Sequence, residues 1–231
     1  MRKLVLFDID GTLLSAAGSG RRAIHTALLE IFGGVGPADY WFDGRTDPEI
    51  VRDLMRLDGH TDALIESRLP AVLERYVDRL SVELADPVHR PELCPGVLRL
   101  LDRLESSDDV VVGLLTGNIE PGAAAKLQAV GLDPKRFTIG AFGSDHAVRG
   151  ELPAIAVARA RAQLGLDVTG QAVVVIGDTP ADVACGSGIG ARAIAVATGR
   201  YTVAELMACN PAAVFADLSD TDAVLASIAG A

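Results

Sequence analysis

Two hydrophobic patterns divide the chain into two parts. Between residues 16 and 91 apolar side chains recur at helical spacing, as in Ile24, Leu28 and Ile31, and no stretch has the pattern of a strand. After residue 91, short runs of consecutive apolar residues alternate with segments of helical periodicity. The first part therefore predicts helices alone, and the second predicts strands that alternate with helices.

The apolar runs of the second part, together with one at the start of the chain, are long enough for buried strands. They lie at residues 3–7, 110–116, 137–142, 172–177, 191–198 and 212–216. Helical segments lie between them at 95–106, 120–132 and 152–165. Strands that are apolar on both faces and alternate with helices are typical of a parallel sheet covered on both sides. The predicted fold is α/β, a Rossmann-like parallel sheet with a helical insert after the first strand: 1–15 and 92–231 form the core and 16–91 the insert.

Two features locate helices within the insert. Asp47 followed by Pro48 is typical of an N-cap residue and a proline in the first turn, so a helix is predicted to start after Asp47. A second helix is predicted over 61–84. Pro70 predicts a break or a kink in it, because proline has no N–H to donate within the helix.

Composition narrows the range of partners. Of the 231 residues 49% are hydrophobic, which is enough for a substantial core, and no apolar run approaches the ~20 residues of a membrane span. A net charge of −10 argues against a general binder of nucleic acid or of anionic membranes. The charge still permits a small anionic substrate in a locally positive pocket, so the expected partner is a small phosphorylated metabolite.

The cysteines indicate a reducing compartment. Cys94, Cys185 and Cys209 are odd in number, scattered and without a CxxC spacing, as expected of free thiols. No signal peptide precedes the first strand, so we expect a cytoplasmic protein. The sequence leaves monomer and homodimer equally open.

Polar residues follow three of the predicted strands. They are Asp8 and Asp10 after the first strand, Thr116, Gly117 and Asn118 after 110–116, and Gly177, Asp178, Thr179 and Asp182 after 172–177. Each group alone is typical of a turn or a helix cap. Together they indicate a site, because ligands of open α/β sheets bind at the carboxyl ends of the strands.

The chemistry of these groups points to phosphoryl transfer. Several carboxylates at adjoining strand ends require a cation, and oxygen ligands suit Mg²⁺. Asp8 can serve as a ligand and as a nucleophile, since aspartate forms acyl phosphates. Asp10 lies on the same side of an extended backbone and can transfer protons. Thr116 and the Gly117 amide can hold phosphate oxygens, and Gly11 permits an unusual backbone or a close approach of phosphate.

Three motifs in this order, "DIDGTLL", "LLTGN" and "GDTPAD", resemble the haloacid dehalogenase superfamily of hydrolases. The stretch at 177–199 resembles its phosphoglycolate-phosphatase-like branch throughout. The resemblance implies that Asp8 is the nucleophile and Asp10 the acid and base. It also implies that the insert is a mobile helical cap, which closes over the site and selects the substrate.

The resemblance further assigns ligands. It implies Thr116 as a phosphate ligand, with Gly117 and Asn118 beside it. It implies Mg²⁺ on the Asp8 carboxylate, the Asp10 backbone carbonyl and Asp178. Asp182 is expected to orient the water ligands of the metal.

One position departs from the family pattern. The family usually has a lysine before the helix that begins here near Leu152, and no lysine lies nearby. Arg149 is the candidate to balance Asp8 and the phosphate, since arginine stays charged and binds phosphate well. A solvated loop arginine is the alternative reading of this residue.

Basic residues of the insert are candidates for substrate contacts. Arg21, Arg22 and Arg45 could reach the closed site, and Arg45 lies between a glycine and a helix start in "FDGRTDPEI". Arg45 is therefore the predicted substrate contact, although cap arginines are often merely solvated.

The resemblance implies a Mg²⁺-dependent phosphatase that hydrolyses a small phosphomonoester, phosphoglycolate or one like it, through an aspartyl-phosphate. A phosphosugar mutase of the same superfamily is the alternative enzyme, although such mutases tend to use a cap lysine and 16–91 contains none. A phospho-accepting signalling domain is about half this length and has no large insert. A binding protein that has lost catalytic activity is the remaining alternative. Dehalogenation is disfavoured, because those members lack the acid that Asp10 supplies.

Overall fold

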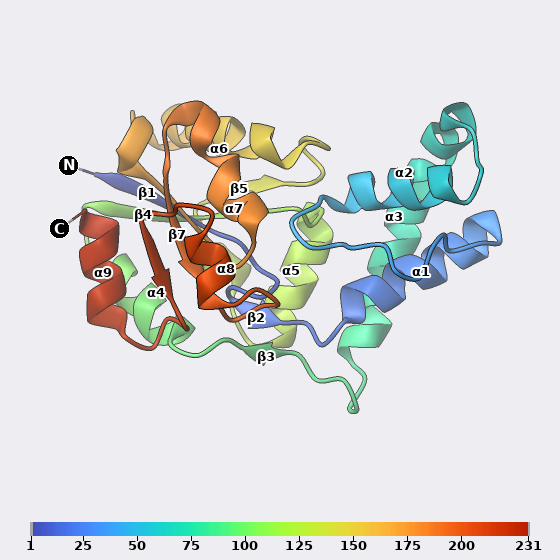
Figure 1. Ribbon diagram of the computed structural model, residues 1–231, viewed down its shortest axis with the longest axis horizontal. Helices are drawn as coiled ribbons and strands as arrows, with labels where there is room; N and C mark the ends of the chain where they lie inside the picture. The colour runs from blue at the N-terminus through green and yellow to red at the C-terminus, as the bar shows by residue number, and fades with distance from the viewer. Residues whose placement is uncertain (1, 231) are drawn as a thin grey trace.

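The computed structural model describes residues 2–230. Figure 1 shows a sheet flanked by helices on one side of the molecule and a separate group of helices on the other. Met1 and Ala231, the two ends of the predicted core, lie outside the described residues. Within residues 2–230, no helix combines the length and the apolar character needed to cross a membrane.

The main sheet has six strands, all parallel. They are β1 (Lys3–Phe7), β4 (Val110–Thr116), β5 (Ile139–Phe142), β6 (Val173–Gly177), β7 (Arg192–Val196) and β8 (Ala213–Phe215). Their order in the sheet is β5-β4-β1-β6-β7-β8. The first strand of the chain therefore lies between β4 and β6, and the carboxyl ends of these three strands are neighbours. The predicted α/β class and its parallel sheet are confirmed.

Helices cover both faces of this sheet. Val5 and Phe7 of β1 belong to a core shared with α4 (Val97–Glu105), α5 (Glu120–Ala129) and α9 (Thr221–Ala229). Leu4 and Leu6 point to the opposite core, which α6 (Leu152–Leu164) and Cys185 of α7 (Pro180–Cys185) complete. Consecutive apolar residues in β1 thus fill two cores, because side chains of a strand alternate between its faces. A short helix, α8 (Val203–Met207), contacts β7 and β8.

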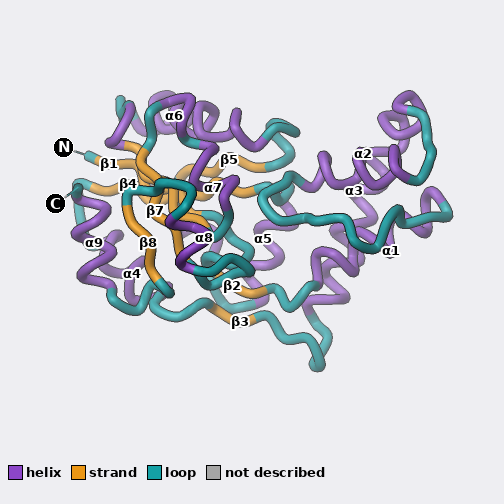
Figure 2. The backbone as a smooth tube through the Cα atoms, in the orientation of Figure 1, coloured by secondary structure: helices purple, strands orange, loops and turns teal. Residues whose placement is uncertain are grey.

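A second group of helices has a core of its own, and we call residues 16–91 the helical unit. It contains α1 (Ser19–Phe32), α2 (Asp47–Leu57) and α3 (Asp62–Leu84), which pack around buried side chains such as Leu28, Leu54 and Tyr76. Two short antiparallel strands, β2 (Leu14–Ser15) and β3 (Glu92–Leu93), pair where the chain enters and leaves this unit (Figure 2).

The first residue of α2 differs from the expectation. Thr46 is the N-cap residue, and its hydroxyl accepts a hydrogen bond from the Glu49 amide at 3.2 Å. Asp47 is already helical, and its carboxylate instead accepts a bond from the Ile119 amide at 2.8 Å. The prediction of Asp47 as the N-cap was wrong because the side chain has a partner in another part of the fold.

Of the break or kink predicted at Pro70, the break does not occur. Helix α3 continues from Asp62 to Leu84 with Pro70 inside it. Pro70 and Glu66 are both exposed, so the Glu66 carbonyl, which loses its donor four residues later, lies on the solvent side. Water can satisfy that carbonyl, and the rest of the helix is held by its packing.

The sequence pattern does not predict several short elements: β2, β3, α7, α8, α9 and four 3-10 turns. A strand of two residues or a helix of five or six is too short for hydrophobic spacing to indicate it. The nine residues of α9 span more than two turns, with Val224 and Ile228 buried at helical spacing, so this helix could have been recognised. The three cysteines are free thiols, two of them buried.

Candidate active site

A cavity of about 480 Å³ lies between the sheet and the helical unit. From the sheet it is lined by residues at the carboxyl ends of β1, β4 and β6, among them Asp8, Asp10, Thr116, Gly117, Asn118 and Asp178. From the helical unit it is lined by the start of α1 and by the loop before α2, including Arg21, Phe42 and Arg45. The polar groups that follow the three strands therefore face one cavity.

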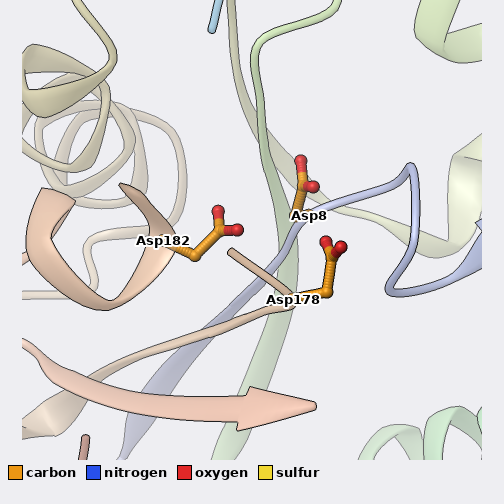
Figure 3. Close-up of side chains that lie close together, drawn as sticks. All are labelled: Asp8, Asp178 and Asp182. Carbon is orange, nitrogen blue, oxygen red and sulfur yellow. The ribbon is translucent and has the colours of Figure 1, made fainter. Parts of the chain in front are cut away.

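Three carboxylates form a buried cluster at one end of this cavity. Asp8, Asp178 and Asp182 each have an oxygen within 4.8 Å of the others, and Figure 3 shows the three side chains close together. Burial, reinforced by the charge of Asp182, raises the pKa of Asp8 to about 6. Burial, with Asp182 and Asp8, raises the pKa of Asp178 to about 9. A cation would relieve this repulsion.

The donor set fits a hard divalent cation. Asp8 and Asp178 offer carboxylate oxygens beside the cavity, and oxygen-only ligation suits Mg²⁺. Asp182 is engaged elsewhere: one oxygen pairs with Arg149, and the other accepts bonds from the Thr179 amide at 3.0 Å and the Thr179 hydroxyl at 2.6 Å. Asp182 is thus placed to act from outside the ligand shell.

The packing around the Asp178 side chain explains the residues of the loop after β1. Gly11 has φ of 81°, and a Cβ on Gly11 or on Gly199 would overlap the Asp178 carboxylate. Thr12 donates a hydrogen bond to that carboxylate at 3.2 Å, and Thr198 donates one to the Gly11 carbonyl at 2.5 Å. The loop after β1 and the turn after β7 therefore enclose Asp178, which accounts for the glycine and threonine of "DGT".

Arg149 lies in the acidic cluster. It belongs to a 3-10 turn before α6, and its Nη2 is 3.0 Å from Asp8 Oδ1 and also pairs with Asp182. The residue is only 7% exposed, which rules out the solvated loop arginine. Burial disfavours the guanidinium charge, but Asp182 and Asp8 outweigh that effect and raise the pKa of Arg149. The arginine therefore remains charged beside Asp8.

Asp10 lies outside this cluster. Its Oδ2 accepts hydrogen bonds from Lys126 Nζ at 2.6 Å and from Asn118 Nδ2 at 2.8 Å. Asn118 also donates to the Thr116 hydroxyl at 2.8 Å and accepts from Lys126 at 2.6 Å. These contacts fix one oxygen of Asp10, and the other accepts no side-chain hydrogen bond from residues 2–230.

Lys126 was missed by the sequence analysis. It lies on α5 and is 4% exposed, on the same buried side as Gly122 and Ala123. A lysine at helical spacing from small buried residues, in the helix after a strand with a polar end, was the available signal. Lysine is rarely buried without a partner, so this position marks a polar site within the fold.

Arg45, the predicted substrate contact, lines the cavity and also pairs with two carboxylates. Its Nη1 is 2.5 Å from Glu49 and 3.2 Å from Asp53, and its guanidinium lies 5.1 Å from the centroid of the Tyr40 ring. Arg45 lines the cavity, but these two carboxylates of α2 offset its charge.

The start of α2 is held against the sheet at one point, which we call the junction. The Asp47 amide donates to the Gly117 carbonyl at 2.8 Å, and the Asp47 carboxylate accepts from the Ile119 amide at 2.8 Å. The Thr46 hydroxyl donates to the Ala147 carbonyl at 2.7 Å. Burial raises the pKa of Asp47 to about 6. The junction brings the helical unit to the strand ends that carry the acidic groups.

The chain is similar in sequence to known proteins. A family model described as haloacid dehalogenase-like hydrolase matches residues 5–187. The chain is 30% identical over 234 residues to a phosphoglycolate phosphatase of Rhodospirillum rubrum, with 95% of this chain and 90% of the relative covered.

Solved structures share the fold over the whole chain. A predicted phosphoglycolate phosphatase from Haemophilus somnus 129pt has a TM-score of 0.69 at 17% identity, covering 97% of this chain and 98% of that one. A putative β-phosphoglucomutase from Bacteroides vulgatus has a TM-score of 0.68 at 21% identity, covering 99% and 89%.

Proposed function

Because the chain belongs to the haloacid dehalogenase-like hydrolases and is a phosphatase of that family, we propose that it hydrolyses a small phosphomonoester with Mg²⁺ through an aspartyl-phosphate on Asp8. The substrate is phosphoglycolate or a compound of similar size, as the name of the Rhodospirillum rubrum relative suggests. The observation that carries the proposal is the position of Asp8, which faces the cavity with Arg149 3.0 Å away.

The first step forms a bond between an Asp8 oxygen and phosphorus and breaks the bond to the leaving alcohol. Asp10 gives that alcohol its proton as the bond breaks. Arg149 offsets the charge of Asp8 and of the phosphoryl oxygens, which would otherwise repel the nucleophile. Thr116 and the Gly117 amide hold phosphoryl oxygens at the end of β4.

The second step returns Asp8 to its starting form. Water attacks the phosphorus of the acyl phosphate, Asp10 takes the proton, and the bond between phosphorus and Asp8 breaks. Lys126 and Asn118 keep Asp10 in one orientation through both steps, because they bind the oxygen that does not exchange the proton.

Asp8, Asp178 and the Asp10 backbone carbonyl would hold Mg²⁺, and Asp182 would act from outside this shell. When bound, Mg²⁺ neutralises negative charge on the phosphate and on the carboxylates. The helical unit serves as the cap: the junction positions it across the cavity, where it separates the substrate from solvent.

The proposal is tested by phosphate release from a panel of small phosphomonoesters with Mg²⁺. Asp8→Asn should abolish turnover, because an amide cannot form the acyl phosphate. Asp10→Asn should lose at least ~10²-fold in rate, the low end for general acid–base catalysis. Asp108→Asn, at an exposed loop position, is the matched control and should behave like the native enzyme.

Four outcomes would contradict the proposal. Near-native hydrolysis by the Asp8→Asn variant would refute the role of Asp8 as the nucleophile. Full activity in excess chelator would refute the requirement for a metal. A phosphorylated Asp8 that persists without release of phosphate would indicate a signalling domain. Conversion of a phosphosugar to its isomer, without net release of phosphate, would identify a mutase.

A further inference from the structure

One cation of the cavity has no carboxylate partner. Five basic side chains line the cavity: Arg21, Arg45, Lys126, Arg149 and Arg200. The last four pair with Glu49, Asp10, Asp8 and Asp43 respectively. Arg21 forms no ion pair with any residue from 2 to 230. Its charge is therefore available to a ligand.

Arg21 is nevertheless held in place. Its guanidinium stacks 3.9 Å from the centroid of the Phe42 ring, and its Nη2 donates to the Tyr40 carbonyl at 2.9 Å. Stacking on an aromatic face leaves the edge donors of a guanidinium free, and these donors suit a carboxylate or phosphate. The side chain is thus oriented before any ligand arrives.

The surroundings of Arg21 also favour negative charge. Arg21 lies in the first turn of α1, a helix of 14 residues with no acidic residue in that turn and no side-chain cap. Gly18 and Gly20 of the same turn line the cavity. The amides at a helix start carry partial positive charge, which an acidic residue usually offsets.

A buried hydroxyl provides an independent indication of a ligand. Tyr76 lines the same cavity and is 0% exposed, and its hydroxyl lies near the Asp47 carboxylate but makes no hydrogen bond of good geometry with any described residue. A Cβ placed on Gly20 would lie 3.7 Å from this hydroxyl, so Tyr76 and the start of α1 share one corner. Buried tyrosine hydroxyls normally have a partner. Burial raises the pKa of Tyr76 well above its usual value, so the hydroxyl keeps its proton and can donate.

Two of the three acidic residues near this corner pair with a cation. Asp10 accepts from Lys126, and Asp43 pairs with Arg200 at 3.5 Å. Asp47 accepts from the Ile119 amide, and burial, which raises its pKa to about 6, disfavours its charged form. Arg21 is the cation of the cavity lining that no carboxylate of residues 2–230 pairs with.

We propose that Arg21, the Tyr76 hydroxyl and the start of α1 bind a carboxylate at the end of the substrate opposite the phosphate. The inference rests on the proposed phosphatase function and narrows its substrate class to short phosphorylated carboxylic acids. Arg21 is a specificity residue in this scheme and takes no part in the bond changes at phosphorus.

Two nearly isosteric substrates test the proposal. 2-Phosphoglycolate carries the carboxylate, and 2-hydroxyethyl phosphate carries a neutral hydroxymethyl group in its place. The native enzyme should favour phosphoglycolate at least ~10-fold in kcat/KM, since a hydrogen bond to a charged group contributes about 1.5–3 kcal/mol and 1.4 kcal/mol is tenfold. Arg21→Ala should bring the ratio of the two kcat/KM values close to one.

Three further variants separate charge from structure. Arg21→Lys should recover part of the ratio, because the charge returns without the planar fork. Tyr76→Phe should lower the ratio less than Arg21→Ala does. Arg22→Ala is the matched control: Arg22 is the next residue of α1, but it pairs with Glu83 at 2.5 Å and lies outside the cavity lining, so the ratio should stay native.

A binding measurement keeps this inference separate from the proposed function. In an Asp8→Asn background, calorimetry with 2-phosphoglycolate should give a Kd at least ~10-fold weaker when Arg21 is also replaced by alanine. This result is expected even if the native protein turned over no phosphomonoester, which would refute the function alone. Equal affinity with and without Arg21, or a native enzyme that does not distinguish the two substrates, would overturn the inference.

Discussion

At the scale of single residues, Arg149 is the group that lets three carboxylates share a buried corner. It pairs with Asp8 and Asp182, and Asp178 lies beside them. Arg149→Ala should slow turnover by about 10²-fold or more, the loss seen when one charge-stabilising donor is removed from a site. Arg149→Lys should restore part of the rate. Steady-state kinetics at saturating Mg²⁺ measures both effects.

The same substitution should also weaken the fold. Removing one partner of a buried ion pair costs about 3–5 kcal/mol, because the other charge is left uncompensated. Glu151→Ala is the control, since Glu151 belongs to the same 3-10 turn but is exposed. If Arg149→Ala kept native kinetics, the cation beside the phosphate would have to come from another residue.

At the scale of elements, the junction between α2 and the loop after β4 depends on a glycine. A Cβ on Gly117 would overlap the carbonyl oxygen of Arg45 and lie 3.1 Å from the Thr46 Cα. Gly117→Ala keeps the amide proposed to bind phosphate but pushes the start of α2 away. We expect kcat/KM to fall at least ~10-fold, because small displacements of positioning groups have large kinetic effects.

Hydrogen exchange provides a direct readout of this displacement. The Asp47 amide, which donates to the Gly117 carbonyl, should exchange faster in Gly117→Ala than in the native protein. Gly150→Ala is the matched control, because a Cβ there meets no atom within 4 Å. Unchanged exchange at Asp47 together with native kinetics would show that the junction does not position the cap.

The central strands show which parts of the fold can be predicted from the sequence. The apolar runs at 3–7, 110–116 and 172–177 indicate β1, β4 and β6, because a strand buried on both faces needs consecutive apolar residues. The strand-end rule then brings Asp8, Thr116 and Asp178 to one edge of the sheet. Their catalytic roles stay predictions.

What the sequence does not indicate depends on contacts between distant residues. Lys126 reaches Asp10 across 116 positions, and Asp47 meets Ile119 across 72, so no local pattern contains either contact. Arg45 lies where a cap loop was expected, but its pairing with Glu49 and Asp53 depends on side-chain directions that spacing alone leaves open.

At the scale of the whole molecule, the acidic cluster links metal binding to stability. A ligand at 100 times its Kd stabilises the folded state by about 2.7 kcal/mol. In a chain of this size each kcal/mol shifts Tm by about 2–4 °C, so Mg²⁺ should raise Tm by about 5–10 °C over chelator. Differential scanning fluorimetry measures this shift without substrate.

Asp178→Asn provides the comparison for the thermal shift. It removes one repelling carboxylate, so the metal-free variant should melt above the metal-free native protein, and its shift with Mg²⁺ should be smaller. Asp108→Asn, exposed and remote from the cluster, should keep the full shift. Identical melting of the native protein in Mg²⁺ and in chelator would exclude a metal at this cluster.

The central place of β1 has a consequence for the time course of synthesis. Leu4 pairs with Val111 on one side and with Val173 on the other, so the second neighbour emerges roughly 170 residues after the first strand. At about 5–20 residues per second, the ribosome needs on the order of ten seconds or more to supply it. During that interval the helical unit, whose contacts are local, can already form. The strand that precedes Asp8 meanwhile exposes four apolar residues with an unpaired edge, and such an edge can pair with other chains until its second neighbour has emerged.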